Sequence, residues 1–118
     1  MLSAIALDHL QNPRHRGPLD DARYGVAGTP GDGPYVEMWV KLEDRRALDA
    51  AFVSHGCPSS MAAGSLMCSL LVRMPATDPL AEMSAQDLLT LLGGLPEGKE
   101  FCADLAVRAA KSAVFGTP

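Results

Sequence analysis

The segment from Ser59 to Val72 places the strongest limit on the fold, because it holds only small or apolar side chains and no charge before Arg73. A helix that is apolar on nearly every side has to be buried, and this one is shorter than the ~20 residues that cross a bilayer. The sequence therefore predicts a buried helix at residues 59–74. With 118 residues the chain has room for one core, so we expect a single domain at residues 1–118.

Strand patterns precede this helix. Residues 24–29 form a short, glycine-interrupted strand, and residues 36–43 alternate strictly between apolar and polar side chains. Alternation returns at Leu48, Ala50 and Phe52. Turn-forming residues separate these segments, so three strands on short connections predict an antiparallel meander.

The remaining segments are helical. Apolar spacing predicts a first helix at residues 2–10, which Asn12-Pro13 ends, and a last helix at residues 99–115. Between them, Ser84 followed by Asp87 begins a short helix that Gly93-Gly94 ends. The predicted fold class is α+β, a three-stranded antiparallel sheet with helices packed on it.

Charge and hydropathy exclude several classes of function. The net charge is −4 and the basic residues are dispersed, so no basic face for nucleic acid is expected. No apolar run is long enough for a membrane span, and the first residues lack the basic start of a signal peptide. We expect a cytoplasmic protein that binds neither nucleic acid nor membrane.

Three cysteines carry the candidate chemistry, and their odd number and lack of a CxxC pair argue against a disulfide framework. Cys57 lies where a strand ends and the buried helix begins, with Pro58 suited to the first helical position. Free backbone N–H groups there favour a thiolate, the form that binds metal or attacks sulfur. The alternative is a buried structural cysteine.

Cys102 lies in the first turn of the last helix, where metal chemistry and core packing are equally open interpretations. Cys68 is in the middle of a helix and is predicted to pack in the core. Asp32, between two glycines at a loop tip, is a turn residue unless the fold brings it to the cysteines. His55, two residues before Cys57, is a weaker candidate ligand.

Four short stretches, taken in order, resemble a known family. They are DHLQNPR at residues 8–14 with Gly17, SHGCPSS at residues 54–60, LPEGK from Leu95 to Lys99, and CADLA at residues 102–106. They are similar to the DHxxNPRxxG opening, the segment around the second cysteine, the LPPVK segment that a specialised chaperone recognises, and the third-cysteine helix. These belong to iron–sulfur cluster assembly scaffold proteins of the IscU, NifU N-terminal and SufU-like type. The resemblance implies an IscU/SufE-like fold.

The chain departs from that family at its metal site. Asp32 stands where the family has its first ligand cysteine, and Pro34 stands where it has an aspartate. Phe101 replaces the histidine that precedes the third cysteine in many members. The resemblance therefore implies an atypical member whose remaining ligands, for iron, a cluster or Zn²⁺, are Asp32, Cys57 and Cys102.

The function implied by the resemblance is a scaffold or carrier, not an enzyme, that transiently binds iron or a [2Fe–2S] cluster for transfer to apo-proteins. Its implied partners are a cysteine desulfurase, apo iron–sulfur proteins and a chaperone at Leu95–Lys99. One alternative is a zinc-binding sulfur-relay protein that accepts persulfide from the desulfurase. Another is a degenerate homologue that acts only through protein contacts.

Overall fold

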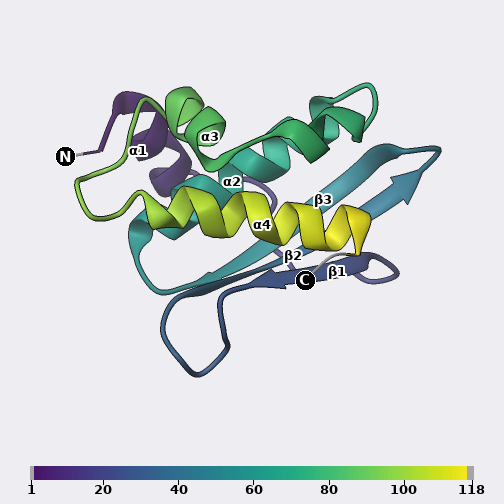
Figure 1. The fold of residues 1–118 in the computed structure, drawn as a ribbon, viewed down its shortest axis with the longest axis horizontal. Coiled ribbons are helices and arrows are strands. Elements are labelled where there is room, and N and C mark those ends of the chain that lie inside the picture. The colour runs from purple at the N-terminus through teal and green to yellow at the C-terminus, as the bar shows by residue number, and fades with distance from the viewer. Residues whose placement is uncertain (1, 117–118) are drawn as a thin grey trace.

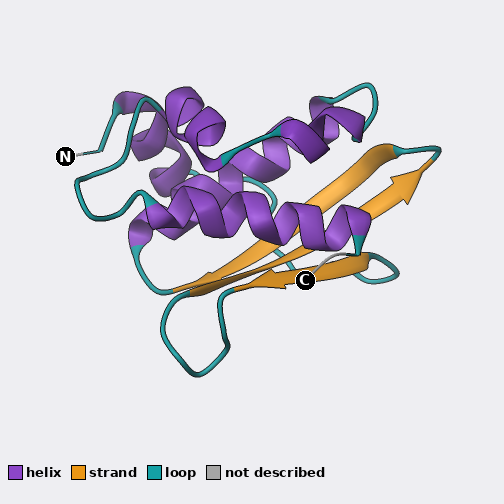
Figure 2. Cartoon of the chain, in the orientation of Figure 1, coloured by secondary structure: helices purple, strands orange, loops and turns teal. Residues whose placement is uncertain are grey.

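The computed structural model describes residues 2–116, and Figure 1 shows a sheet covered by helices. In chain order the elements are α1 (Ala4–Gln11), β1 (Arg23–Ala27), β2 (Tyr35–Glu43), β3 (Arg46–His55), α2 (Pro58–Arg73), a 3-10 helix η1 (Asp78–Glu82), α3 (Ala85–Leu92) and α4 (Phe101–Phe115). Figure 2 shows the helices gathered on one face of the sheet. The predicted α+β class is confirmed, and η1 is the element that the sequence patterns did not predict.

The sheet is an antiparallel meander in the order β1-β2-β3, as the short connections predicted. Along β2, Val36, Met38 and Val40 are fully buried, while the intervening Glu37 and Trp39 are only partly covered. One face of the strand thus contributes to the core and the other faces solvent, which is what its alternating sequence requires.

The alternation predicted at residues 48–52 fails at its first residue. Lys41 pairs with Asp49 and Leu42 pairs with Ala47, so Leu48 is an extra residue at an irregularity in the β2–β3 register. Its side chain is 56% exposed, whereas Ala47 is buried. One inserted residue reverses the face to which the following side chains point, so the earlier part of β3 is out of phase with the later part.

Two glycines, Gly25 and Gly64, allow close contacts between the helices and the sheet. A Cβ atom at Gly25 of β1 would lie 2.3 Å from the backbone nitrogen of Ala113 in α4. A Cβ atom at Gly64 of α2 would lie 2.5 Å from the ring of Phe52 in β3. At both positions the absence of a side chain lets a helix pack tightly against the sheet, although the core has few large aromatic side chains.

The uncharged segment forms the central helix, as predicted. Most of the α2 residues from Ser59 to Leu71 are buried, between the sheet on one side and the other helices on the other. Its first residue is Pro58 and its only charged residue, Arg73, is the last. Within residues 2–116, no helix has the length and hydropathy that a membrane span requires.

Candidate functional site

The structure brings two of the candidate cysteines into contact. Cys57 is the N-cap residue of α2 and Cys102 is the second residue of α4. Their Sγ atoms are 3.3 Å apart. In Figure 1 the starts of both helices lie together at the end of the sheet where β3 passes into α2. Two segments separated by most of the helical half of the chain therefore supply one pair of sulfurs.

The Ser60 side chain contacts both sulfurs. Its fully buried hydroxyl donates to Cys102 Sγ at 3.7 Å and lies 3.8 Å from Cys57 Sγ. The backbone N–H of Ser60 also donates to the Cys57 carbonyl, which closes the first turn of α2. Sequence reasoning did not single out Ser60. Its three-residue spacing from the N-cap directs the side chain back over the helix start, but that spacing does not indicate a contact with Cys102.

The two sulfurs have opposite acid–base character. Partial burial opposes ionisation of Cys57, but hydrogen bonds from the Cys102 thiol and from the Ser60 and Ser59 backbone outweigh it, and its pKa is lowered. Burial, together with the hydrogen bond to Cys57, raises the pKa of Cys102 to about 12. Cys57 is thus the more acidic sulfur of the pair and Cys102 the thiol that donates to it.

Cys68 takes no part in this pair. It is fully buried in the middle of α2, and burial, with the charge of Asp49 as a smaller contribution, raises the pKa of its thiol. A neutral, enclosed thiol of this kind is a small apolar core residue, as the sequence predicted.

Asp32 lies at the exposed tip of the β1–β2 loop, between Gly31 and Gly33. Its backbone N–H donates to the carbonyl of Thr29, a turn contact. The same loop touches the Cys57 loop further along, since a Cβ atom at Gly56 would lie 2.9 Å from Pro34 Cβ. Within residues 2–116, no three side chains of His, Cys, Asp or Glu are grouped closely enough to hold a metal ion. The structure therefore unites Cys57 with Cys102 and leaves the Asp32 carboxylate apart from them.

His55 is engaged elsewhere. Its Nε2 atom lies 3.0 Å from a carboxylate oxygen of Glu37, and its ring stacks on Tyr35 with centroids 4.0 Å apart. Glu37 also accepts a hydrogen bond from Tyr24. These side chains lie on the solvent face of the sheet. His55, the weaker candidate ligand, therefore contacts Glu37 and Tyr35 there and not the sulfur pair.

The segment from Leu95 to Lys99 forms the connection between α3 and α4, immediately before Cys102. A turn is closed there by the Lys99 N–H, which donates to the Pro96 carbonyl. Glu97, Gly98 and Lys99 are exposed. The loop is thus accessible to another protein and covalently close to the sulfur pair.

The geometry of the pair fits one cation between the sulfurs. Two thiolates that hold a tetrahedral metal ion at metal–sulfur distances of ~2.3 Å are about 3.8 Å apart. The observed separation of 3.3 Å is about 0.5 Å shorter than this. A small side-chain rotation supplies the difference, and binding would remove the Cys102 proton as the metal takes its place.

We expect iodoacetamide to alkylate Cys57 at least about a hundredfold faster than Cys102, because Cys57 is partly exposed and its pKa is lowered, whereas Cys102 is fully buried and its pKa is raised. Cys68 is as fully buried as Cys102 and lies in the middle of α2, so it should react only on unfolding. The rate at each cysteine is measured by mass spectrometry across a pH series.

A matched pair of variants tests the cause. Cys102→Ala removes the thiol that donates to Cys57, so the alkylation profile of Cys57 should move to higher pH, whereas Cys102→Ser keeps a donor and should move it less. Equal reactivity of Cys57 and Cys102 in the unsubstituted protein would contradict this assignment of thiolate and thiol.

Known proteins share this arrangement of elements over almost the whole chain. The family model described as the NifU-like N terminal domain matches residues 2–116. The "Iron-sulfur cluster assembly scaffold protein IscU 1" of Archaeoglobus fulgidus is 31% identical over 115 residues, which is 97% of this chain and 74% of that protein. The IscU scaffold protein of Escherichia coli is 31% identical over 117 residues, which is 95% of this chain and 90% of that protein.

A solved structure agrees on the fold. The N-terminal part of a nitrogen-fixing NifU-like protein from Brucella abortus superimposes with a TM-score of 0.73 at 17% identity, over 96% of this chain and 91% of that one. The family match spans both helix starts that carry the sulfur pair. This chain therefore belongs to the NifU-like N-terminal domain family.

Proposed function

We propose that this protein is an iron–sulfur cluster assembly scaffold or carrier, which transiently binds iron or a [2Fe–2S] cluster and passes it to apo-proteins. The observation that carries the proposal is the contact between the Sγ atoms of Cys57 and Cys102, 3.3 Å apart at the starts of two helices. The relatives named as IscU scaffold proteins support the same role. In this role the protein is a carrier and not an enzyme, and the cluster is its cargo.

Cys57, Cys102 and Asp32 form the proposed ligand set. Gly31 and Gly33 flank Asp32 with φ values of +84° and +93°, and a Cβ atom at either would meet nothing within 4 Å. The loop tip is therefore free of packing constraints, and it starts from the same end of the sheet as the Cys57 loop, where Tyr35 pairs with His55. Closure of this loop would bring the carboxylate to a metal already held by the sulfurs.

A ligand set of two thiolates and one carboxylate is incomplete for a cluster that normally takes four ligands. The fourth ligand would come from a second protein, either a second copy or the recipient. Weak, incomplete ligation suits a carrier, because a cluster that is held loosely is released readily to an apo-protein with four cysteines.

The proposed partners follow from the same surface. A cysteine desulfurase would supply sulfide at the partly exposed Cys57, and a chaperone would bind the exposed Leu95–Lys99 loop. Three free thiols are typical of a reducing compartment, which supports a place in the cytoplasm.

Anaerobic reconstitution with ferrous iron and sulfide tests the proposal. We expect visible absorption typical of a [2Fe–2S] cluster, and its transfer to an apo-ferredoxin that is present in excess. The absorption spectrum and the ferredoxin's regained activity are the two measurements. Protein that stays colourless, or that keeps its cluster indefinitely, would contradict a carrier.

A zinc-binding sulfur relay is the second candidate, and the lowered pKa of Cys57 favours it. In that reaction the Cys57 thiolate attacks the outer sulfur of the desulfurase persulfide. The desulfurase thiolate leaves, so one S–S bond forms as another breaks and there is no net oxidation. This alternative predicts about one zinc per chain in purified protein and a single added sulfur at Cys57 after desulfurase treatment.

A further inference from the structure

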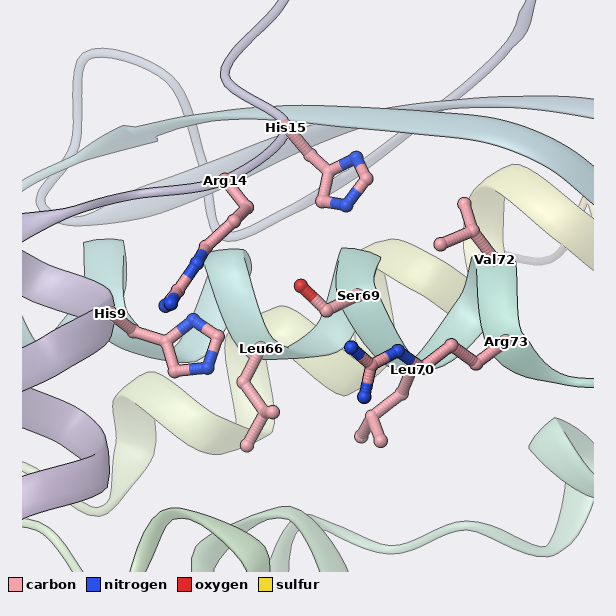
Figure 3. A pocket seen from close by; sticks show the side chains of 8 residues that line it. All are labelled: His9, Arg14, His15, Leu66, Ser69, Leu70, Val72 and Arg73. Carbon is pink, nitrogen blue, oxygen red and sulfur yellow. The ribbon is translucent and has the colours of Figure 1, made fainter.

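A hollow lies between α1, the loop after it and α2, and neither Cys57 nor Cys102 lines it. Its volume is about 340 Å³, within the range of small-molecule sites. Figure 3 shows His9 from α1, Arg14 and His15 from the loop, and Leu66, Leu70 and Arg73 from α2 around it. Several of these residues belong to the opening motif at residues 8–17, for which the sulfur pair gives no role.

Basic side chains dominate the lining. Arg14, Arg73, His9 and His15 all line the hollow, and no acidic side chain does. Asp8, the nearby carboxylate, is held by Arg14 Nη2 at 2.8 Å and does not line it. In a chain whose net charge is −4, two arginines beside two histidine rings in one concave site favour a negatively charged ligand.

One nitrogen of the Arg14 guanidinium lacks an acceptor. Arg14 Nη1 is shielded from solvent, and within residues 2–116 it makes no hydrogen bond. A buried guanidinium N–H without an acceptor costs free energy, and a ligand oxygen recovers that cost once the Arg14 side chain turns Nη1 towards the hollow. Arginine presents its N–H groups as a planar fork that matches a carboxylate or a phosphate.

His9 adds a second donor. Its Nδ1 atom lies 2.7 Å from the Ser65 hydroxyl, which also accepts the backbone N–H of Arg14 at 2.9 Å. With the hydroxyl proton directed to Nδ1, the ring carries its own proton on Nε2. Burial, and then the charge of Arg14, lower the pKa of His9, so the ring is a neutral N–H donor before a ligand enters.

The site is held open by the fold rather than by chance side-chain positions. The His15 carbonyl accepts from the Phe52 N–H and the Gly17 N–H donates to the Phe52 carbonyl, both at 2.9 Å, which fastens the loop to β3. Across from it, Leu66, Leu70 and Arg73 lie on one side of α2 at helical spacing. Arg14 and His15 therefore face the side of α2 that carries Leu66, Leu70 and Arg73.

We propose that this hollow binds a small oxyanion ligand, a carboxylate or phosphate group attached to a short apolar body. Arg14 and Arg73 bind the charged group, His9 donates to it, and Leu66 and Leu70 contact the carbon body. The site is separate from the sulfur pair and does not depend on the function proposed for that pair.

Calorimetric titration with two probes, succinate and inorganic phosphate, tests the proposal at low ionic strength. We expect saturable binding with one ligand per chain. The tighter probe identifies whether the carboxylate with its carbon body or the phosphate is the better ligand. Arg14→Gln and Arg73→Gln should each weaken binding at least about tenfold, because each removes a charge-assisted hydrogen bond.

Arg45→Gln is the matched control, because it removes the same charge from an exposed arginine that pairs with Asp78 outside the hollow. It should leave the affinity unchanged. Arg73 is exposed, and within residues 2–116 it forms no ion pair or side-chain hydrogen bond, so Arg73→Gln should fold normally even if Arg14→Gln does not. Absence of saturable binding for both probes, or equal weakening by Arg45→Gln and Arg73→Gln, would overturn the proposal.

Discussion

Cys57→Ala should abolish the visible absorption that the protein gains on anaerobic reconstitution with iron and sulfide. Cys57 is the more acidic sulfur of the pair, and without it the proposed site retains one thiol of raised pKa and one carboxylate that lies apart from it. A cluster cannot be held by so few ligands. Absorbance per chain and bound iron per chain, measured after desalting, should both fall to the level of protein that was never exposed to iron.

Cys68→Ala is the control for this result. It removes a cysteine that is fully buried in α2 and away from the pair, so it costs some stability but should leave the absorption intact. Cys102→Ala should behave like Cys57→Ala. Full absorption in Cys57→Ala, or loss of absorption only in Cys68→Ala, would show that iron and sulfide bind elsewhere.

Gly25→Val should lower the free energy of unfolding by about 3 kcal/mol or more, the upper range for overpacking. A Cβ atom at Gly25 would lie 2.3 Å from the Ala113 nitrogen and 2.6 Å from the Ala109 carbonyl oxygen. These are backbone atoms of α4, so a rotamer change cannot relieve the clash and the helix has to move. Urea denaturation followed by circular dichroism measures the change.

Leu48→Val is the control for Gly25→Val, because it introduces valine at an exposed position of β3. It should change the free energy of unfolding by no more than about 0.5 kcal/mol. Valine is favoured in strands, so strand propensity alone would make Gly25→Val stabilising. An unchanged urea midpoint for Gly25→Val would mean that α4 does not rest on β1.

The helices and strands could be predicted because local signals and tertiary packing agree along most of the chain. The uncharged run at residues 59–72 can avoid exposing its apolar side chains only as a buried central helix, and Ser84 with Asp87 forms the capping box that the spacing indicated. Leu48 could not be predicted to be exposed, because the irregularity depends on how β3 pairs with β2 and not on β3 alone. The 3-10 helix η1 is too short to leave a periodic pattern.

The candidate site was predictable where it depends on helix starts. Cys57 and Cys102 were singled out from their places at the beginnings of two helices, and those beginnings meet in the fold. The role of Ser60 could not be read from the sequence, since it requires both sulfurs to be within reach of one hydroxyl. The position of Asp32 depends on a glycine-flanked loop, whose path no local pattern fixes.

The basic hollow was harder still to predict from the sequence. Arg14 and His15 lie in a loop and Arg73 lies far along the chain, at the end of α2. Their meeting depends on the loop's hydrogen bonds to Phe52 of β3. A sequence pattern can place each residue on an element, but the packing of the elements decides which residues face each other.

A crystal structure of the reconstituted protein, with the iron located by anomalous scattering, tests the central claim most directly. The account predicts iron at ~2.3 Å from both the Cys57 and Cys102 sulfurs, the usual metal–thiolate distance. Iron bound away from these sulfurs, or a Cys57–Cys102 disulfide that excludes the metal, would contradict it.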